Sequence, residues 1–325
     1  MGLLVHILLF LLSASIIWFF AGLLIESVNN VARRFNQSGF TVAFFVLGFL
    51  TSISEISVMV NSTINGTPQV SAGNLVGASF VIILLVIPVV AIVGKDIQLR
   101  RTIKRRNLAL ALITILLPPL LMLDGSVSLR EGLICIMFFA TLLYLIRSDS
   151  RDKVPKIIKE VEQELIDSRK STAVDIVKII VGAVFIFVAG HLLVEEAVFL
   201  ANFLSVPVSI IGLLVLSVGT NIPELVIAVR SILKKRKDIA FGDYLGSSVA
   251  NVFVFGLLPV LNGRFSVEPT EFIATAALML VGFTMFYFFA KSQNKISRKE
   301  GLVLVSIYVM FVVIQTINLI RFATD

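Results

Sequence analysis

The chain contains 325 residues, of which 57% are hydrophobic and only 15% are charged, and its formal net charge at pH 7 is +7. Soluble domains carry roughly 25% charged residues, so this composition excludes a soluble globular protein and indicates an integral membrane protein. The single cysteine, Cys135, excludes an internal disulfide. The basic runs are short and flank apolar segments, so we expect no nucleic-acid partner.

Ten stretches of the chain are apolar and long enough to cross a bilayer as helices, which takes about 20 residues each. In chain order they span 2–24, 40–64, 70–94, 107–123, 131–147, 174–200, 207–232, 242–261, 270–290 and 301–320. The first stretch lacks a basic leading segment and continues into Trp18, Phe19 and Phe20, so we interpret it as a retained helix and not as a signal peptide. The sequence predicts an all-α membrane protein with ten transmembrane helices.

The distribution of basic residues supports this count. If successive helices alternate in direction, 25 of the 28 Lys and Arg residues fall on one side of the membrane, and only Arg130, Arg264 and Arg321 fall on the other. Lys and Arg concentrate in cytoplasmic loops. We therefore expect both termini to lie outside the cytoplasm, with the cell membrane as the location.

The two halves of the sequence repeat one pattern at a separation of 169 residues. The shift places Thr51 on Thr220, Glu55 on Glu224, and Gly73 on Gly242. We predict a first five-helix repeat at 1–147, a cytoplasmic linker with an amphipathic helix at 148–173, and a second five-helix repeat at 174–325. Because five is an odd number, the two repeats are inverted in the membrane, which is a recurrent architecture of transporters with an ion site at the midplane.

Glu55 and Glu224 lie in the middle of the second and seventh apolar stretches. A charged side chain at the bilayer centre costs about 2.5–3.5 kcal/mol on insertion scales, so two related acids predict a cation site. Thr51 and Thr220 each precede the glutamate by four residues, which places each pair on one helix face. Two carboxylates and two threonine oxygens supply hard ligands of the kind that Ca²⁺ prefers.

The apolar stretch after each glutamate begins with glycines four residues apart. These are Gly73 and Gly77 in the first half, and Gly242 and Gly246 in the second. Small residues at this spacing let membrane helices approach closely, so they indicate either helix packing alone or a site shared by neighbouring helices. Ser247 and Asn251 share one helix face and add neutral oxygens to the candidate site.

The runs Gly219-Thr220-Asn221-Ile222-Pro223-Glu224 and Gly242-Asp243-Tyr244-Leu245-Gly246-Ser247, with weaker copies in the first half, resemble the alpha repeats of the cation/Ca²⁺ exchanger superfamily. They resemble its sodium/calcium branch more than its proton-coupled branch. The resemblance implies a central Ca²⁺ site flanked by Na⁺ sites. The residues predicted to bind these transported ions are Thr51, Ser52, Glu55, Ser217, Thr220, Asn221, Glu224, Ser247 and Asn251.

The first repeat departs from the family pattern more than the second. Leu50 and Ser54 replace a glycine and the proline, and Ala78 and Ile82 stand where the family places a serine and an Asn or Asp. The two-glutamate, two-threonine centre is kept, whereas one flanking Na⁺ site loses ligands. We therefore expect divalent-cation binding to be retained and the usual number of coupled Na⁺ ions to change.

Three functional classes follow from these features. The first is a secondary-active antiporter that exchanges Ca²⁺ for Na⁺ by alternating access, with H⁺-coupled exchange of Ca²⁺ or Mn²⁺ as its variant. The second is an ion channel, which would more naturally assemble a symmetric pore from several subunits than two inverted halves. The third is a degenerate cation-binding membrane protein with altered selectivity. No nucleophile and base accompany the acids, so we expect neither an enzyme nor a cofactor, only inorganic cations and the lipid bilayer as partners.

Overall fold

The computed structural model describes residues 3–33, 52–94, 96–98, 103–149, 169–221, 224–225, 228, 237–292 and 295–324. Within these ranges the protein is helical apart from two short two-stranded ladders. Eight of the described helices are long and apolar enough to cross a membrane, and a shorter apolar helical segment spans Val208–Thr220. The protein is therefore an all-α, multi-pass membrane protein, as the composition predicts.

The helices of the first half follow the predicted apolar stretches. Their bounds are α1 Leu3–Arg33, α4 Ile53–Ile64, α5 Pro68–Val81, the π-helical η2 Ile82–Val86, α6 Ile87–Gly94, α7 Arg105–Leu121, the short 3-10 helix η3 Met122–Asp124 and α8 Leu129–Asp149. α5, η2 and α6 follow one another without a gap and form one long span. Only the later part of the second predicted stretch, 40–64, lies within the described residues.

The helices of the second half also follow the predicted apolar stretches. Their bounds are α10 Arg169–Phe203, α11 Val208–Ile211, the π-helical η4 Gly212–Leu216, α12 Ser217–Thr220, α14 Lys237–Asn262, α15 Pro269–Ser292 and α16 Arg298–Thr324. The amphipathic helix expected in the 148–173 segment falls mostly on residues 150–168, which lie outside the described residues. α10 itself begins at Arg169, earlier than the predicted start of the sixth span at 174.

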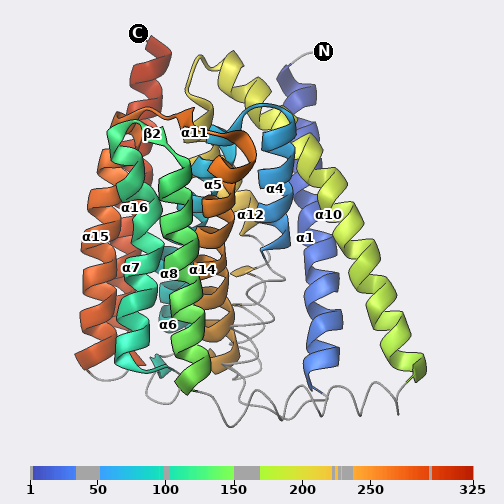
Figure 1. Ribbon diagram of the computed structural model, residues 1–325, viewed down its shortest axis with the longest axis vertical. Helices are drawn as coiled ribbons and strands as arrows, with labels where there is room; N and C mark the ends of the chain where they lie inside the picture. Colours follow the sequence, from blue (N-terminus) through green and yellow to red (C-terminus); the bar gives the residue numbers. More distant parts are fainter. Residues whose placement is uncertain are drawn as a thin grey trace.

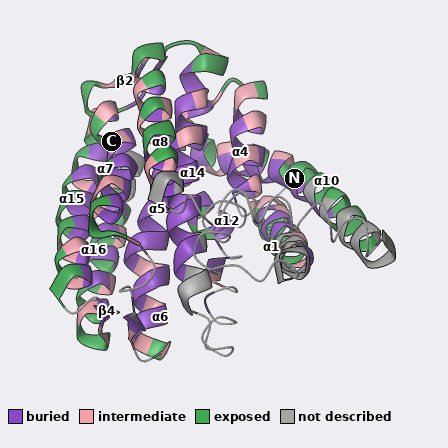
Figure 2. Ribbon diagram, turned by 60° about the horizontal axis from the view of Figure 1, so that its bottom comes forward, coloured by how far each residue is buried: buried purple, intermediate pink, exposed green. Residues whose placement is uncertain are grey.

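The described helices form a bundle with a distinct pair beside it. α5 and α14 contact one another in the interior, and α14 also packs against α4, α7 and α8. In Figure 2 both central helices are buried along much of their length, whereas α10 is largely exposed. α1 and α10 pack together at one side of the bundle in Figure 1, and α10 contacts α4. The core of the bundle is thus separate from a smaller core beneath α1 and α10.

Short ladders close both ends of the bundle at positions related by the repeat. At one end β1, Ile97–Gln98, pairs antiparallel with β4, Lys295–Ile296. At the other end β2, Ser126–Val127, pairs antiparallel with β3, Phe265–Ser266. Adding 169 to the residue numbers of β2 yields those of β4. β1 and β2 belong to the first half and β3 and β4 to the second, so each ladder joins one strand from each half.

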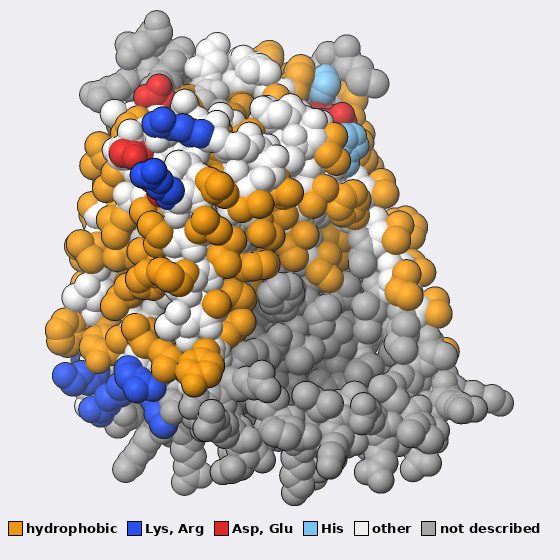
Figure 3. Space-filling view, in the orientation of Figure 1, with side chains coloured by type: hydrophobic (Ala, Val, Ile, Leu, Met, Phe, Trp, Pro, Cys, Tyr) orange, Lys and Arg blue, Asp and Glu red, His pale blue; other side chains and the backbone are white. Residues whose placement is uncertain are grey.

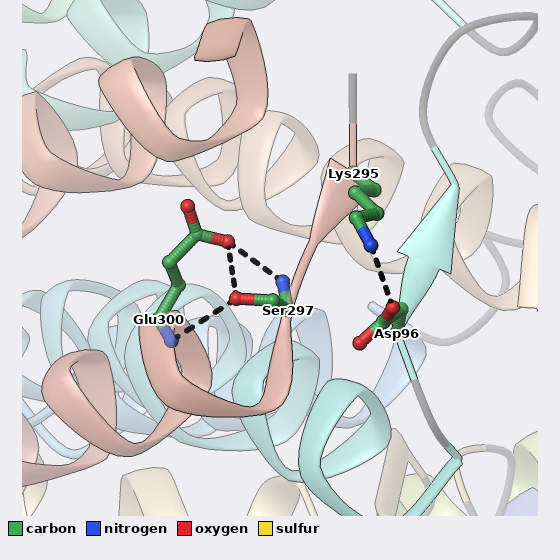
Figure 4. Close-up of polar contacts among 4 residues, drawn as sticks. All are labelled: Asp96, Lys295, Ser297 and Glu300. Atoms are coloured by element: carbon green, nitrogen blue, oxygen red, sulfur yellow. Dashed lines mark hydrogen bonds and ion pairs between the residues drawn. The ribbon is translucent and has the colours of Figure 1, made fainter. Parts of the chain in front are cut away.

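The helix that follows each of these two strands begins with the same capping arrangement. Before α8, the Ser128 backbone N–H donates to Glu131 Oε2 at 2.5 Å. Before α16, the Ser297 backbone N–H and hydroxyl both donate to Glu300 Oε2 at 2.7 Å, as Figure 4 shows. In both, the acid satisfies an N–H that the helix leaves open, and at α16 the Glu300 N–H donates back to the Ser297 hydroxyl, which completes a capping box. Ser128 and Ser297 are 169 residues apart, so the repeat extends to helix starts.

An apolar belt surrounds the bundle between two polar ends. Figure 3 shows the visible side chains of this belt as hydrophobic, with basic groups at one end and mixed basic, acidic and histidine groups at the other. Both chain termini lie at the mixed end in Figure 1. This is the surface expected of a protein whose middle contacts lipid and whose ends contact water.

Candidate functional site

The site lies where the described chain departs from helical geometry shortly before each glutamate. In the second half, α12 ends at Thr220 and Asn221 follows in a non-helical conformation with φ −93° and ψ 8°. In the first half, Ser52 precedes α4 with φ −73° and ψ 5°. These two residues are related by the 169-residue shift. Among the described residues, Asn221 and Ser52 therefore lie outside helical geometry at equivalent points, each three positions before its glutamate.

Helical hydrogen bonding resumes in the same way after both breaks. The Ile56 N–H donates to Ser52 O at 2.9 Å, and the Leu225 N–H donates to Asn221 O at 3.2 Å. Broken helices inside a membrane are tolerated where the freed backbone groups are buried in protein or line a cavity. The two breaks thus place irregular backbone beside the acids.

Glu55 lies on the first turn of α4 with an exposed fraction of 1%. The Ser54 hydroxyl donates to Glu55 Oε2 at 2.8 Å, and the Thr220 side chain lies beside the same carboxyl group. Glu55 Oε1 is buried and has no hydrogen-bond partner among the described residues. An acid of the first half and a threonine of the second therefore meet, and one carboxyl oxygen remains available to an ion.

Thr220 and two further side chains of the second-half segment, with Asn74 of α5, continue this polar cluster. The Thr220 hydroxyl donates to Asn74 Oδ1 at 3.2 Å, which joins α12 to α5. The Asn221 amide donates to Ser217 O at 2.6 Å, and the Ser217 hydroxyl donates to Leu213 O at 2.5 Å. All of these side chains except Leu213 are polar and fully buried. Their oxygens are hard, neutral donors of the type that accompanies carboxylates around Ca²⁺ and Na⁺.

The glycines of α5 bring the two segments into backbone contact. A Cβ atom on Gly73 would lie 2.1 Å from Ser209 O, and one on Gly77 would lie 2.2 Å from Leu213 O. Gly212 makes the reciprocal contact, because a Cβ there would lie 2.3 Å from Val70 O. The packing interpretation of Gly73 and Gly77 is therefore confirmed. This packing also positions Asn74, which lies between the two glycines, against Thr220.

α14 supplies the remaining predicted residues. Ser247 and Asn251 are 1% exposed, and both polar atoms of the Asn251 side chain lack a hydrogen-bond partner within the described ranges. The Tyr244 hydroxyl donates to Glu224 O at 3.3 Å, which fixes the backbone of the fully buried second glutamate against α14. The Ser79 hydroxyl lies 3.5 Å from Ser248 O. Since these two serines are 169 residues apart, α5 and α14 meet at equivalent positions of the repeat.

Most of the predicted residues thus lie buried on α4, α5, α12 and α14 or in the breaks between them. Thr51 lies outside the described residues, as does Pro223. No group of three or more His, Cys, Asp or Glu that could hold a metal occurs among the described side chains. Any ion at this site would therefore be held by one or two carboxylates and by neutral oxygens.

Sequence reasoning misses Asn74 and its contact with Thr220. Its amide Nδ2 is buried and has no hydrogen-bond partner in the described part of the chain, while Oδ1 accepts from Thr220. Its place between two glycines of a membrane helix is the signal that could have identified it, because a polar side chain there faces the neighbouring helix. Ala78 and Ile82, which stand where the family pattern has polar residues, are fully buried. The π-helical segment η2 begins at Ile82.

Comparison with known proteins agrees with this arrangement. The profile of the family described as sodium/calcium exchanger protein matches residues 5–147 and 174–317 in two segments. An uncharacterized membrane protein of Methanocaldococcus jannaschii, MJ0091, is 24% identical over 301 residues, which cover 93% of this chain and 95% of that protein. The sodium/calcium exchanger MaX1 of Methanosarcina acetivorans is 32% identical over 142 residues, which cover 44% of this chain and 41% of that protein.

A solved structure shares the fold. The sodium-calcium exchanger NCX_Mj, soaked with Na⁺ and Sr²⁺, superposes with a TM-score of 0.67 at 22% identity, and the alignment covers 96% of this chain and 99% of that one. The similarity covers both halves and the segments that carry the two glutamates. At this identity the superposition establishes a common fold.

Proposed function

Because this chain belongs to the sodium/calcium exchanger family, which consists of transporters and not of enzymes, we propose that it is a secondary-active antiporter exchanging Ca²⁺ for Na⁺. The ions bind in turn at the Glu55 and Glu224 site. Alternating access then exposes that site to each side of the membrane. The proposal assigns ten membrane spans to the chain, arranged as two inverted five-helix repeats around the site.

The observation that supports this proposal is the contact between Glu55 and Thr220 in a buried cluster of polar side chains. A carboxylate buried in a membrane protein is costly unless an opposite charge neutralises it. None of the described ion pairs provides a basic partner for Glu55. A bound cation would supply the missing charge, and two carboxylates would balance one Ca²⁺.

The orientation and the location form part of the proposal. Basic side chains dominate the described end that carries the β1 and β4 ladder, as Figure 3 indicates. The positive-inside rule assigns that end to the cytoplasm. Both termini then lie outside the cytoplasm, and a cell membrane is the expected host.

Counterflow in proteoliposomes tests the function. Vesicles loaded with Na⁺ should take up ⁴⁵Ca²⁺ when diluted into Na⁺-free buffer, and uptake should disappear when Na⁺ is equal on both sides. Glu55→Gln and Glu224→Gln should each abolish uptake, whereas Glu268→Gln, which changes an exposed acid, should not. Uptake that continues without a trans ion would contradict exchange and indicate a channel.

The substitutions at Ala78 and Ile82 favour one second candidate, a family member with changed coupling. An H⁺-coupled exchanger of Ca²⁺ or Mn²⁺ would need fewer Na⁺ ligands than the sodium-driven branch. The same vesicles distinguish the two when a pH gradient replaces the Na⁺ gradient. Uptake driven by the pH gradient alone would replace the sodium-coupled proposal.

A further inference from the structure

A third buried acid lies away from the two central glutamates. Glu271 stands in the first turn of α15 with an exposed fraction of 0%. Its Oε1 atom is buried and has no hydrogen-bond partner among the described residues. Its neighbour Glu268, one turn earlier, is exposed to solvent. The start of α15 thus has one ordinary surface acid just before the helix and one acid sealed inside the protein on its first turn.

Contacts from α11 and α16 hold Glu271, one to its side chain and one to its backbone. The Ser209 hydroxyl of α11 donates to Glu271 Oε2 in a short contact. From α16, the Gln315 amide Nε2 donates to Glu271 O at 2.9 Å and to Thr275 Oγ1 at 2.7 Å. Thr275 and Gln315 are also fully buried. The acid therefore joins α11, part of the segment that leads to Thr220, to two helices of the surrounding bundle.

None of the ion pairs in the described part of the chain involves Glu271. The nearest acid in sequence is Glu268, just before α15. η3 contributes Asp124, whose Oδ1 accepts from the Ser126 backbone, and Arg264 donates to the Ser126 hydroxyl and not to Glu271. α11 and α16 present the neutral groups Ser209, Gln315 and Asn318. The last turn of α7 and the whole of η2 are apolar.

These ligands suit a proton better than a metal ion. Gln315 turns its amide nitrogen toward the Glu271 backbone and Thr275, while its Oε1 accepts from Asn318 at 3.3 Å. Among the described side chains in contact with Glu271, the carboxyl group and the Ser209 hydroxyl remain for a cation, which is too few oxygens for Ca²⁺ with its 6–8 ligands. A buried carboxyl without a counter-ion becomes neutral by binding a proton. With a proton on Oε2, the acid donates to the Ser209 hydroxyl.

We propose that Glu271, enclosed by Ser209, Thr275 and Gln315, is a proton-binding site that connects the ion-site segment to the surrounding bundle. Ser209 is held on its other side as well, because its carbonyl oxygen presses against Gly73 of α5. Ser209 and Thr220 are 11 residues apart, or about 16 Å at 1.5 Å per helical residue. Loss of the proton leaves a buried anion. Its high free energy falls only if water enters or if α11 moves. The position of α11 therefore depends on the proton, and so does the rate of exchange.

Infrared spectroscopy of the purified full-length protein tests the proton site without reference to transport. In a Glu55→Gln, Glu224→Gln background, the carbonyl stretch of a buried protonated carboxyl group should be present and should disappear as the pH is raised. Adding Glu271→Gln should remove that band, and adding Glu268→Gln should leave it. Ser209→Ala should shift the band's frequency, since it removes the hydrogen-bond partner. An unchanged band in the Glu271→Gln protein would overturn the proposal.

Exchange assays test whether the proton on Glu271 controls the rate of exchange. This part of the proposal rests on the proposed function. The rate of exchange should depend on pH at the side of the membrane that carries the termini, and Glu271→Gln should at least halve that dependence while Glu268→Gln leaves it unchanged. A pH profile of Glu271→Gln that matches the wild type would refute the link to α11. If the wild type exchanges no ions, the proposed function fails and the infrared measurement still decides whether Glu271 holds a proton.

Discussion

The Thr220 hydroxyl, from the second half, contacts two residues of the first half, since it lies beside Glu55 and donates to Asn74 at 3.2 Å. Thr220→Val keeps the branched shape and removes the hydroxyl. A hydrogen bond to a charged group contributes about 1.5–3 kcal/mol, and 1.4 kcal/mol is tenfold in affinity. We expect Ca²⁺ binding, measured by isothermal titration, to weaken by roughly 10-fold or more.

A matched control for this prediction lies on α7. Thr114 is buried like Thr220, but its hydroxyl donates to the Leu110 carbonyl of its own helix at 2.7 Å. Thr114→Val should bind Ca²⁺ as the wild type does. Equal affinities of the two variants would show that the Thr220 hydroxyl takes no part in ion binding.

Ala78 offers a test of how Na⁺ is coupled to Ca²⁺ uptake, because one added oxygen atom changes the site. It is fully buried on α5 and is the repeat equivalent of Ser247 on α14. Ala78→Ser restores an oxygen that the family resemblance places there, with little change in volume. We expect the Na⁺ dependence of Ca²⁺ uptake to become steeper, seen as a higher Hill coefficient. Ala72→Ser, equally buried on the same helix, is the control, and an identical steepening there would argue against a site effect.

Individual residues differ in how well sequence alone predicts them. The burial predicted for Glu55 and Glu224 is confirmed, because an acid inside a long apolar stretch is visible without a structure. Glu271 lies at the edge of the ninth stretch, where an acid is ordinarily a solvated helix end. Its burial depends on α11 and α16, which are distant in sequence. The missed residues are thus those whose environment comes from tertiary packing.

At the level of elements, the helix breaks illustrate the same limit. Pro223 predicts a break in the second half, and α12 does end nearby, at Thr220. Ser54 provides no such signal in the first half, yet α4 also begins only after Ser52. Polar residues next to a buried acid compete for backbone hydrogen bonds. Equivalent geometry is therefore kept with a proline in one half and without one in the other.

The contact between α5 and the η4 segment leads to a prediction about packing. Gly77→Ala places a Cβ against the Leu213 carbonyl oxygen and the Ser217 side chain, and the backbone oxygen has no freedom to yield. Overpacking of this kind costs about 1–3 kcal/mol. We expect a lower midpoint of thermal unfolding in detergent and weaker Ca²⁺ binding, because the helices that carry Asn74 and Thr220 must separate.

Gly219→Ala is the control for stability in this experiment. A Cβ at Gly219 meets no atom within 4 Å, and alanine favours a helix more than glycine by about 1 kcal/mol. Its unfolding midpoint should equal or exceed that of the wild type. A Gly77→Ala protein with an unchanged midpoint would mean that α5 and η4 are not in backbone contact.

On the scale of the whole molecule, the α1 and α10 pair is attached to the bundle through the site helix α4. His6 of α1 contacts Glu196 of α10 at 2.8 Å, which joins the pair. On the other side of α10, Gly190 lies against Ser57 of α4, and His191 contacts Asn61 at 3.1 Å. α4 also carries Glu55. Any displacement of the pair would therefore act directly on a helix that holds one of the central acids.

The orientation of the molecule can be tested with α15, which runs between the two ladders. Ser266 in β3 and Ser292 at the end of α15 are both exposed. α15 has 24 residues, about 36 Å at 1.5 Å each, which exceeds a hydrocarbon core of about 30 Å. The two serines therefore lie on opposite sides of the membrane, and the native Cys135 is buried and should label weakly.

In intact cells, a thiol reagent that does not cross membranes should label Ser266→Cys and not Ser292→Cys. Both variants should label after the cells are opened, which controls for expression and exposure. The direction follows from the basic residues, because Lys291, Lys295 and Arg298 surround the Ser292 end and positive loops remain in the cytoplasm. The reverse labelling pattern would invert the proposed orientation while leaving the fold intact. Labelling of both serines from outside would mean that α15 does not cross the membrane.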